Sequence, residues 1–322
     1  MPKAGPPAMR KVLCYTQIMR YLYPDTSIWN CLCDQDVGPD ALWSRLGGSG
    51  IVPVIGFNAL YEIAKLFFVG TDEATGRGRE LMTYMKGFLA LGVPIVKENW
   101  ALLIEEAMDV AGEKQMESPF RGQNDYQASV RAIDRLLNGE INNGEAQFFG
   151  SRKSAARSSR VGMKGHLEAR PDLMAVLTKT SDEALPEFLR TASVGPAGQF
   201  VLLGHLRAEF PENSVTDLAA VASLLLRSSR YRFSHAMIRS DLYLNWRCAN
   251  RGSIRSDLPD DTFHVVSAAY SEFFVTTEPD QANIARYSID GVRAFVCDRG
   301  GSVMDQILGE TRGQREFIAI ER

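Results

Sequence analysis

Short, continuous apolar runs at the two ends of the chain constrain its fold more than any other feature. Two of them, residues 20–23 and 51–55, lie near the N-terminus, and two more, residues 273–277 and 293–297, lie near the C-terminus. Runs of this length without polar alternation are typical of strands that are buried on both faces of a parallel sheet. The sequence therefore predicts an α/β fold, a three-layer sandwich with a mainly parallel central sheet that both ends of the chain build.

A long helical segment separates these two pairs of runs. From about residue 78 to residue 243 apolar residues recur at helical spacing, and only residues 93–96 interrupt this pattern with a strand-like run. We therefore expect a large helical insertion within the α/β core. The predicted organisation is a flexible extension at residues 1–18, a first half of the core at 19–98, the helical insertion at 99–231 and a second half of the core at 232–322.

The overall charge limits how such a chain can bind nucleic acid. Hydrophobic residues make up 45% of the 322 positions, charged residues 23%, and the formal net charge is −3. A chain with this balance does not coat nucleic acid through overall positive charge, so phosphate contacts require a local basic patch or bound metal ions. Residues 151–165 carry five basic residues and no acid, and they form either such a contact or a solvated loop.

The cysteines and the first residues indicate the compartment. The five cysteines are an odd number and are scattered, and residues 1–18 lack the apolar segment of a secretory signal. We therefore expect reduced thiols in a cytoplasmic protein. No apolar run approaches the ~20 residues that a bilayer-spanning helix needs, so no membrane association is expected.

Four acidic residues lie at positions where an α/β sheet binds its ligands. Asp25 directly follows the first apolar run, and Glu278 directly follows the run at residues 273–277. If these runs are parallel neighbours, both carboxylates point into the crevice beyond the carboxyl ends of the strands. Asp261 starts the predicted helix that leads into the second of these strands, and Glu62 lies on the helix after the second run.

Each acid also has a simpler explanation. Asp25 and Asp261 could cap the helices that follow them, and each cap would contribute about 1 kcal/mol. Glu62 could be a solvated surface charge, and Glu278 could shape a turn together with Asp280. Considered as a group, however, crowded carboxylates raise one another's pKa and normally require a cation. Oxygen ligands of this kind suit Mg²⁺ or Mn²⁺, which can activate a water molecule to hydrolyse a phosphodiester bond.

Four segments resemble the PIN-domain family of metal-dependent ribonucleases, and they occur in the order of that family. They are Tyr21-Leu22-Tyr23-Pro24-Asp25-Thr26-Ser27, Leu60-Tyr61-Glu62-Ile63, Asp261-Thr262-Phe263-His264-Val265-Val266-Ser267-Ala268-Ala269 and Phe274-Val275-Thr276-Thr277-Glu278. The chain departs from the family pattern in having Pro24 before the first acid and Glu278 where aspartate is common. It also carries more than 150 residues between Glu62 and Asp261.

The resemblance implies a nuclease that uses Mg²⁺ or Mn²⁺ and cuts nucleic acid, RNA rather than DNA. Its catalytic residues and metal ligands would be Asp25, Glu62, Asp261 and Glu278, with Asp280 as a substitute for Glu278. The family analogy extends to toxin–antitoxin or defence roles, and a homo-oligomer or an inhibitory protein partner is compatible with it. The alternative is a PIN-like scaffold or RNA-binding module that has lost catalysis.

Two further side chains, His264 and Arg247, each have both a functional and a structural interpretation. His264 lies one turn after Asp261 on the same helix face, where it could orient a carboxylate or a metal-bound water, or could be a packed, hydrogen-bonded helix residue. Arg247 belongs to a set of arginines spaced four residues apart, which could contact phosphate or form a solvated face.

Overall fold

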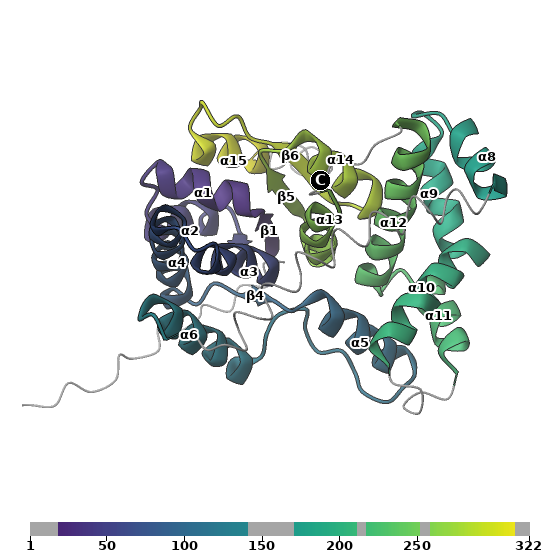
Figure 1. Cartoon of the computed structure of the whole chain (residues 1–322), viewed down its shortest axis with the longest axis horizontal. Helices are drawn as coiled ribbons and strands as arrows, with labels where there is room; N and C mark the ends of the chain where they lie inside the picture. The colour runs from purple at the N-terminus through teal and green to yellow at the C-terminus, as the bar shows by residue number, and fades with distance from the viewer. Residues whose placement is uncertain (1–18, 141–170, 211–216, 252–257, 313–322) are drawn as a thin grey trace, which may run out of the picture.

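The computed structural model describes residues 19–140, 171–210, 217–251 and 258–312 (Figure 1). The predicted flexible extension at residues 1–18 and the basic segment at residues 151–165 lie outside the described residues.

A four-stranded parallel sheet with the order β2-β1-β5-β6 forms the centre of the α/β core. The strands are β1 (Arg20–Pro24), β2 (Ile51–Pro53), β5 (Phe273–Thr276) and β6 (Arg293–Val296). The central strand β1 pairs with β2 on one side and with β5 on the other, so it joins the two ends of the chain. The prediction of a mixed α/β fold with a mainly parallel sheet built from both ends is confirmed.

A second, two-stranded parallel sheet follows β2 in the chain. It consists of β3 (Ile55–Gly56) and β4 (Ile95–Val96). The N–H of Val54, between β2 and β3, donates to the carbonyl of Leu22 in β1 at 2.9 Å, and the N–H of Ile55 donates to the carbonyl of Pro94 at 2.9 Å. The run predicted as one strand at residues 51–55 therefore divides, and its second part pairs with β4.

The apolar runs form strands because both of their faces are buried. In β1 and β5, Leu22, Phe273 and Val275 belong to the hydrophobic core on one face of the sheet, whereas Tyr23 and Phe274 belong to the core on the other. Successive side chains of a strand point to opposite faces, so a run without polar residues supplies both cores at once. Each such side chain stabilises the fold by about 1.5–3 kcal/mol relative to an exposed position.

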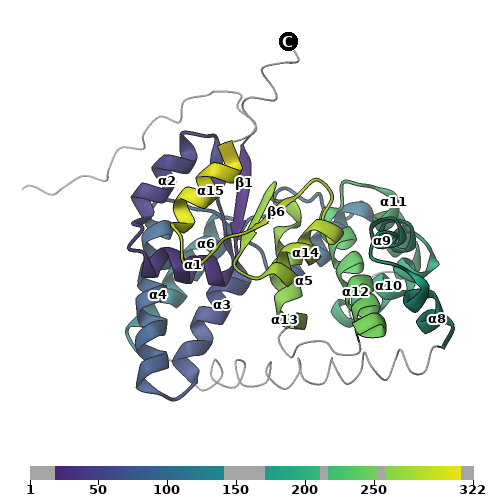
Figure 2. The same cartoon turned by 90° about the horizontal axis from the view of Figure 1, so that it is seen from above.

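Helices from both ends of the chain cover the first face of the sheet. They are α1 (Thr26–Asp34), α2 (Pro39–Gly47), α3 (Phe57–Lys65), the 3₁₀ helix η1 (Leu66–Phe68), α4 (Asp72–Ala90) and α15 (Val303–Arg312). Figure 2 shows α1, α2, α3, α4 and α15 on one side of β1, and α12, α13 and α14 on the other. Their buried residues form one core with Leu22 and Val275 of the sheet.

The second face is covered by α12 (Arg232–Arg251), α13 (Leu258–Ser267), the 3₁₀ helix η2 (Ala268–Tyr270) and α14 (Pro279–Ser288). The helices α5 (Asn99–Val110), α8 (Pro171–Lys179), α9 (Leu185–Val194), α10 (Pro196–Glu209) and α11 (Leu218–Arg227) pack outside them. All of these helices share one hydrophobic core with the second face of the sheet. None of the helices in the described ranges combines the length and hydropathy that a bilayer-spanning helix requires.

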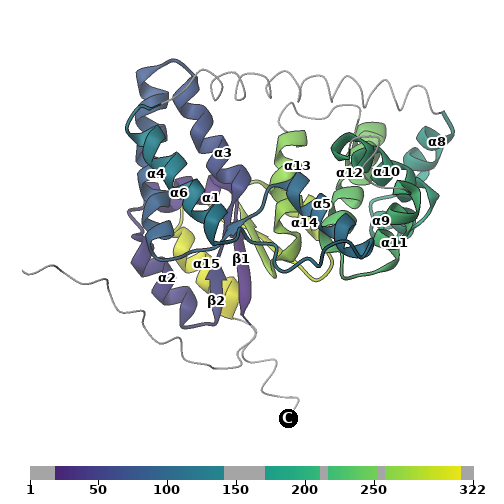
Figure 3. The same cartoon turned by 90° about the horizontal axis from the view of Figure 1, so that it is seen from below.

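One helix of the predicted insertion, α6 (Gln123–Leu137), packs with the first half of the core instead. It lies along α4 (Figure 3), where the Tyr126 hydroxyl donates to the carbonyl of Leu89 at 2.7 Å. Its residue Ile133 belongs to the core of the first face. The domain boundaries at residues 98/99 and 231/232 remain predictions, but this helix shows that the segment between them contributes to both faces of the sheet.

The strand order reverses at β1, whose carboxyl end lies beside that of β5. From β1 the chain first moves outward to β2, and it later returns to form β5 on the opposite side of β1. In doubly wound sheets, ligands bind in the crevice at this reversal of strand order. Asp25 follows β1 directly, and its N–H donates to the carbonyl of Val275 in β5 at 3.0 Å.

Candidate active site

Asp25 is a buried carboxylate that caps α1 at the carboxyl end of β1. Its Oδ1 atom accepts hydrogen bonds from the N–H of Ile28 at 3.0 Å and from the Ser27 hydroxyl at 2.7 Å. Its Oδ2 atom accepts from the Thr276 hydroxyl on β5 at 2.6 Å. The side chain is only 1% exposed. Burial raises its pKa, and the hydrogen bonds from Thr276 and Ser27 and the charge of His264 oppose this rise without cancelling it.

Glu62 of α3 and His264 of α13 form an ion pair beside Asp25. The Glu62 Oε2 atom lies 3.1 Å from His264 Nε2, and the Thr26 hydroxyl lies 3.4 Å from the same nitrogen. The other ring nitrogen, Nδ1, lies 3.4 Å from the Tyr23 hydroxyl. Burial alone would raise the pKa of Glu62, but the charge of His264 and its hydrogen bond lower it to about 2. His264 is therefore a buried, hydrogen-bonded helix residue, which was one of its two interpretations from the sequence. It also pairs with the Glu62 carboxylate, as the other interpretation allowed.

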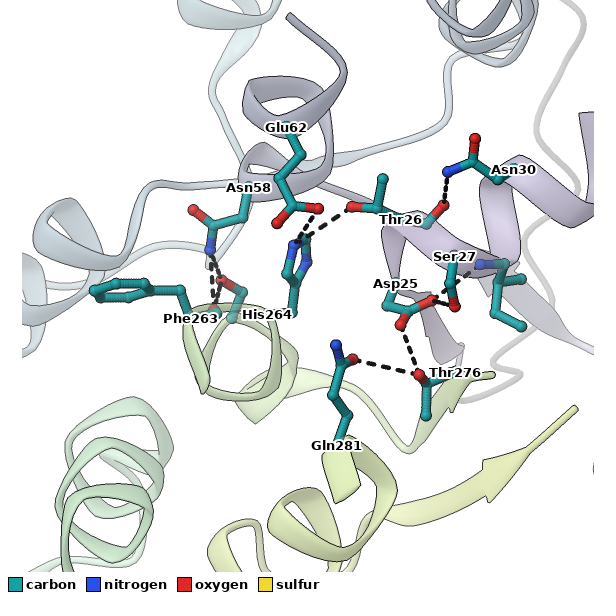
Figure 4. Close-up of polar contacts among 12 residues, drawn as sticks. Asp25, Thr26, Ser27, Asn30, Asn58, Glu62, Phe263, His264, Thr276 and Gln281 are labelled. Atoms are coloured by element: carbon teal, nitrogen blue, oxygen red, sulfur yellow. Dashed lines mark hydrogen bonds and ion pairs between the residues drawn. The ribbon is translucent and has the colours of Figure 1, made fainter. Parts of the chain in front are cut away.

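Three of the four predicted acids act on the His264 imidazole. Burial alone would lower the pKa of His264, which is 2% exposed, but the charges of Glu62, Asp25 and Asp261 raise it above its ordinary value. Asp261 is half-buried and lies three residues before His264 on α13, so the two side chains share a face of the helix. Figure 4 shows the ring of His264 between Glu62 and Thr26, with Asp25 on the neighbouring strand end. Acids from three segments that are distant in sequence thus raise the pKa of one buried imidazole.

The fourth predicted acid, Glu278, follows β5 but pairs with an arginine. Its N–H donates to the Thr276 hydroxyl at 2.9 Å, which places its backbone beside the group that holds Asp25. Its carboxylate Oε1 atom lies 2.9 Å from Nη2 of Arg299. Asp280, the predicted substitute, has an arginine partner too, since its Oδ2 atom lies 2.7 Å from Nη2 of Arg247. The structure therefore brings the backbone of Glu278 to the site and gives each of these two carboxylates a cationic partner.

Several side chains that organise the site were not predicted from the sequence. Asn58 of α3 donates to the carbonyl of Phe263 at 2.9 Å and to the Ser267 hydroxyl at 2.8 Å, so it fixes α3 against α13 and keeps Glu62 beside His264 (Figure 4). The hydroxyls of Ser27 and Thr276 orient Asp25. The hydroxyl residues that directly follow Asp25 and precede Glu278 were a usable signal, because such residues at strand ends commonly bond neighbouring carboxylates.

The donor set agrees with a divalent cation in its chemistry but does not form a finished cage. Within the ranges that the structure describes, no three His, Cys, Asp or Glu side chains are grouped so that they could hold a metal ion. The acids nevertheless offer the oxygen ligands that Mg²⁺ and Mn²⁺ prefer. Asp25 accepts three hydrogen bonds, whereas a carboxylate has about four lone-pair directions. Cys31 and Cys33 are half-buried free thiols.

Comparison of the chain with protein-family models, with curated proteins and with solved structures found no match. The assignment of a function therefore depends on the residues and their geometry.

Proposed function

We propose that the chain is a metal-dependent nuclease of PIN-like type, which hydrolyses phosphodiester bonds of nucleic acid, with RNA preferred to DNA. One observation carries this proposal. Glu62 of α3 pairs with the buried His264 of α13 at 3.1 Å, Asp25 lies on the neighbouring strand end (Figure 4), and the charges of Asp25 and Asp261 also raise the pKa of His264. Because carboxylates gathered in this way repel one another, they require a positive charge, and the imidazolium supplies it in the absence of a metal ion.

Asp25, Glu62 and Asp261 are the ligands that would hold Mg²⁺ or Mn²⁺, with Glu278 or Asp280 as a fourth acid. A divalent cation at such a site lowers the pKa of a bound water and neutralises charge on the phosphate. Ser27 and Thr276 keep the Asp25 carboxylate in one orientation, and the ion pair with His264 keeps Glu62 in place. These residues therefore prepare the site before substrate arrives.

A second candidate function is a PIN-like scaffold or RNA-binding module without catalysis. The observation that favours it is the ion pair of Glu62 with His264 at 3.1 Å, together with the arginine partners of Glu278 and Asp280. In this case the acids form ion pairs that hold the fold together, and a bound metal ion would not lead to hydrolysis.

The decisive experiment compares the wild type with Asp25→Asn on labelled single-stranded RNA and DNA, in Mg²⁺, in Mn²⁺ and in EDTA. We expect cleavage of RNA only with the wild type and a metal, and a loss of at least about 10²-fold in rate for Asp25→Asn, as for other groups that bind the reacting centre. The matched control is Asp40→Asn, the same change at an exposed position in the first turn of α2, which should cleave at the wild-type rate.

Cleavage that survives both Asp25→Asn and EDTA would contradict the proposed mechanism. Calorimetric binding of Mn²⁺ by the wild type without cleavage of either strand would instead favour the scaffold.

A further inference from the structure

A depression of about 420 Å³ lies beside α1 and α4, and its lining residues contact two of the four acids, Asp25 and Glu278. Its lining includes Ser27, Asn30 and Asp34 of α1 and two arginines, Arg77 of α4 and Arg299 of the segment after β6. Ser27 belongs to both places, because it lines the depression and donates to Asp25 at 2.7 Å. The depression is therefore one hydrogen bond away from Asp25 of the proposed active site.

The two guanidinium groups are held differently. Arg77 is bound on three sides, since it contacts Asp34 and Glu80 at 2.6 Å each and Asn30 at 3.1 Å, and its side chain is 29% exposed. Arg299 has one acidic partner, Glu278, and its side chain is 63% exposed. A single exposed ion pair contributes little stability, so a ligand with more negative charge can displace it. Arg299 is thus the group in the depression that is ready to bind an anion, while Arg77 is a fixed positive charge beside it.

A chain of hydroxyl groups sets the position of Arg299 relative to Asp25. Arg299 donates to the Thr277 hydroxyl through Nη2 at 2.8 Å and through Nε at 3.1 Å. The Thr277 hydroxyl donates to that of Ser27 at 2.8 Å, and Ser27 donates to Asp25. The guanidinium is therefore fixed two hydroxyl groups away from the carboxylate that the proposed reaction requires.

We infer that this depression binds a phosphate group of a nucleic-acid strand, the one adjacent to the phosphodiester bond that is cut. This inference rests on the proposed function. A guanidinium suits phosphate because its planar fork can donate two parallel hydrogen bonds. Phosphate contacts of this kind position a strand without reading its sequence. Since the net charge of the chain is −3, a local cationic site is needed to retain the strand.

The test measures binding with no cleavage. Full-length wild type, Arg299→Ala and Arg45→Ala are titrated in EDTA with a labelled single-stranded RNA of about ten nucleotides, a length within the range that strand-binding sites cover, and anisotropy is read over a series of salt concentrations. Arg45 is the matched control, because it is also an exposed arginine (55%) with one acidic partner, Asp305 at 3.6 Å, and it does not line the depression.

We expect Arg299→Ala to weaken binding by about tenfold, the value of one charge-assisted hydrogen bond. The slope of log K against log salt should decrease in magnitude by ~0.7, as for one lost phosphate contact to a single strand. Arg45→Ala should match the wild type, and Arg299→Lys should restore the salt slope. A strand of the same sequence with a neutral backbone should not distinguish the wild type from Arg299→Ala. Inorganic phosphate should compete only at far higher concentration than RNA, if the ligand is a strand and not a free ion.

The outcomes separate this inference from the nuclease proposal. Equal affinity and equal salt slope for wild type and Arg299→Ala overturn the phosphate site, even if the wild type cuts RNA with Mg²⁺. A wild type that does not bind the strand at all overturns it as well. A tenfold loss in Arg299→Ala supports the site even if no cleavage is found with any metal. Because Arg299 is well exposed, its removal should leave the thermal unfolding midpoint unchanged, which the same samples can show.

Discussion

At the scale of single residues, two hydroxyl groups determine how the Asp25 carboxylate is held. Ser27 and Thr276 each donate to it, and Thr276 itself is fully buried. A buried carboxylate is tolerated only where its oxygens have hydrogen-bond partners. The same contacts that make the carboxylate stable in the interior also fix its direction, so a structural and a functional requirement coincide in these side chains.

Two replacements of Thr276 distinguish the contribution of its hydroxyl to stability from the contribution of its side-chain volume. Thr276→Val keeps the volume but leaves Asp25 Oδ2 without its donor, and we expect a loss of about 2–3 kcal/mol in the free energy of unfolding. Thr276→Ser keeps the donor and removes a methyl group, which should cost about 1 kcal/mol. Urea denaturation of the three proteins measures this difference. A valine variant as stable as the serine variant would show that the hydrogen bond to Asp25 contributes nothing net.

At the scale of elements, buried polar groups join helices that are distant in sequence. Glu106 of α5 is fully buried and accepts from the N–H groups of Phe233 and Ser234 at 2.9 and 2.8 Å, which lie in the first turn of α12. Glu106, which belongs to the predicted insertion, thus caps the N-terminus of α12, a helix of the predicted second half of the core. The Tyr270 hydroxyl of η2 donates to the same carboxylate. These contacts fix α5 relative to α12 and to the strand β5 that follows η2.

The strands were predictable from the sequence, whereas the packing partners of the helices were not. The run at residues 273–277 indicated β5 because it is short for a helix and consists of aromatic and β-branched residues, which favour strands. The helical pattern near residues 126–137 indicated α6 correctly, but an amphipathic pattern gives the buried face and not the element that covers it, so its packing on α4 was not foreseen. The position of Asp25 followed from the strand end and the helix cap, whereas the prediction that Asp261 starts and could cap its helix was wrong, because α13 begins at Leu258. The pairing of His264 with Glu62, about two hundred residues away, depends on tertiary packing that no local pattern records.

A pair of histidines on α10 and α12 makes the stability depend on pH in opposite directions. Burial lowers the pKa of His205, but the hydrogen bond and charge of Asp241, 2.7 Å away, raise it above its ordinary value. The pair therefore contributes stability below the unfolded pKa of 6.5, and this contribution is lost as the pH rises through the folded pKa. We expect His205→Gln to destabilise the protein by less than about 1 kcal/mol in mild acid, since both side chains are substantially exposed, and by less still at alkaline pH.

His235 provides the control for this prediction. Burial, followed by the charge of Arg239, lowers its pKa, so the stability contributed by neutral His235 is present above pH 6.5 and is lost as the pH falls. Urea denaturation of His205→Gln and of His235→Gln across this pH range should give differences from the wild type of opposite slope. Parallel slopes would show that the Asp241 pair does not raise the pKa of His205 in solution.

At the scale of the whole molecule, the helical insertion and the sheet share one hydrophobic core. Leu202 of α10 and Leu225 of α11 are fully buried in the same cluster as Phe274 of β5 and Tyr23 of β1. A core that continues from the sheet into the outer helices gives no plane along which they could separate without exposing apolar surface. The sheet and the helices that cover its second face should therefore unfold as one unit.

Removing a buried side chain from the far side of this core tests the coupling. We expect Leu202→Ala to cost about 2–5 kcal/mol, as for other fully buried leucines, and to lower the protection of the β5 amides against hydrogen exchange by a corresponding amount. The control is Leu224→Ala on α11, whose side chain is 44% exposed and whose removal should change neither quantity by more than about 0.5 kcal/mol. If Leu202→Ala lowers protection in α9 to α11 and leaves the β5 amides at wild-type protection, the outer helices open on their own. Thr276 at the end of β5 donates to Asp25. Independent opening of the outer helices would therefore show that their unfolding leaves the proposed site intact.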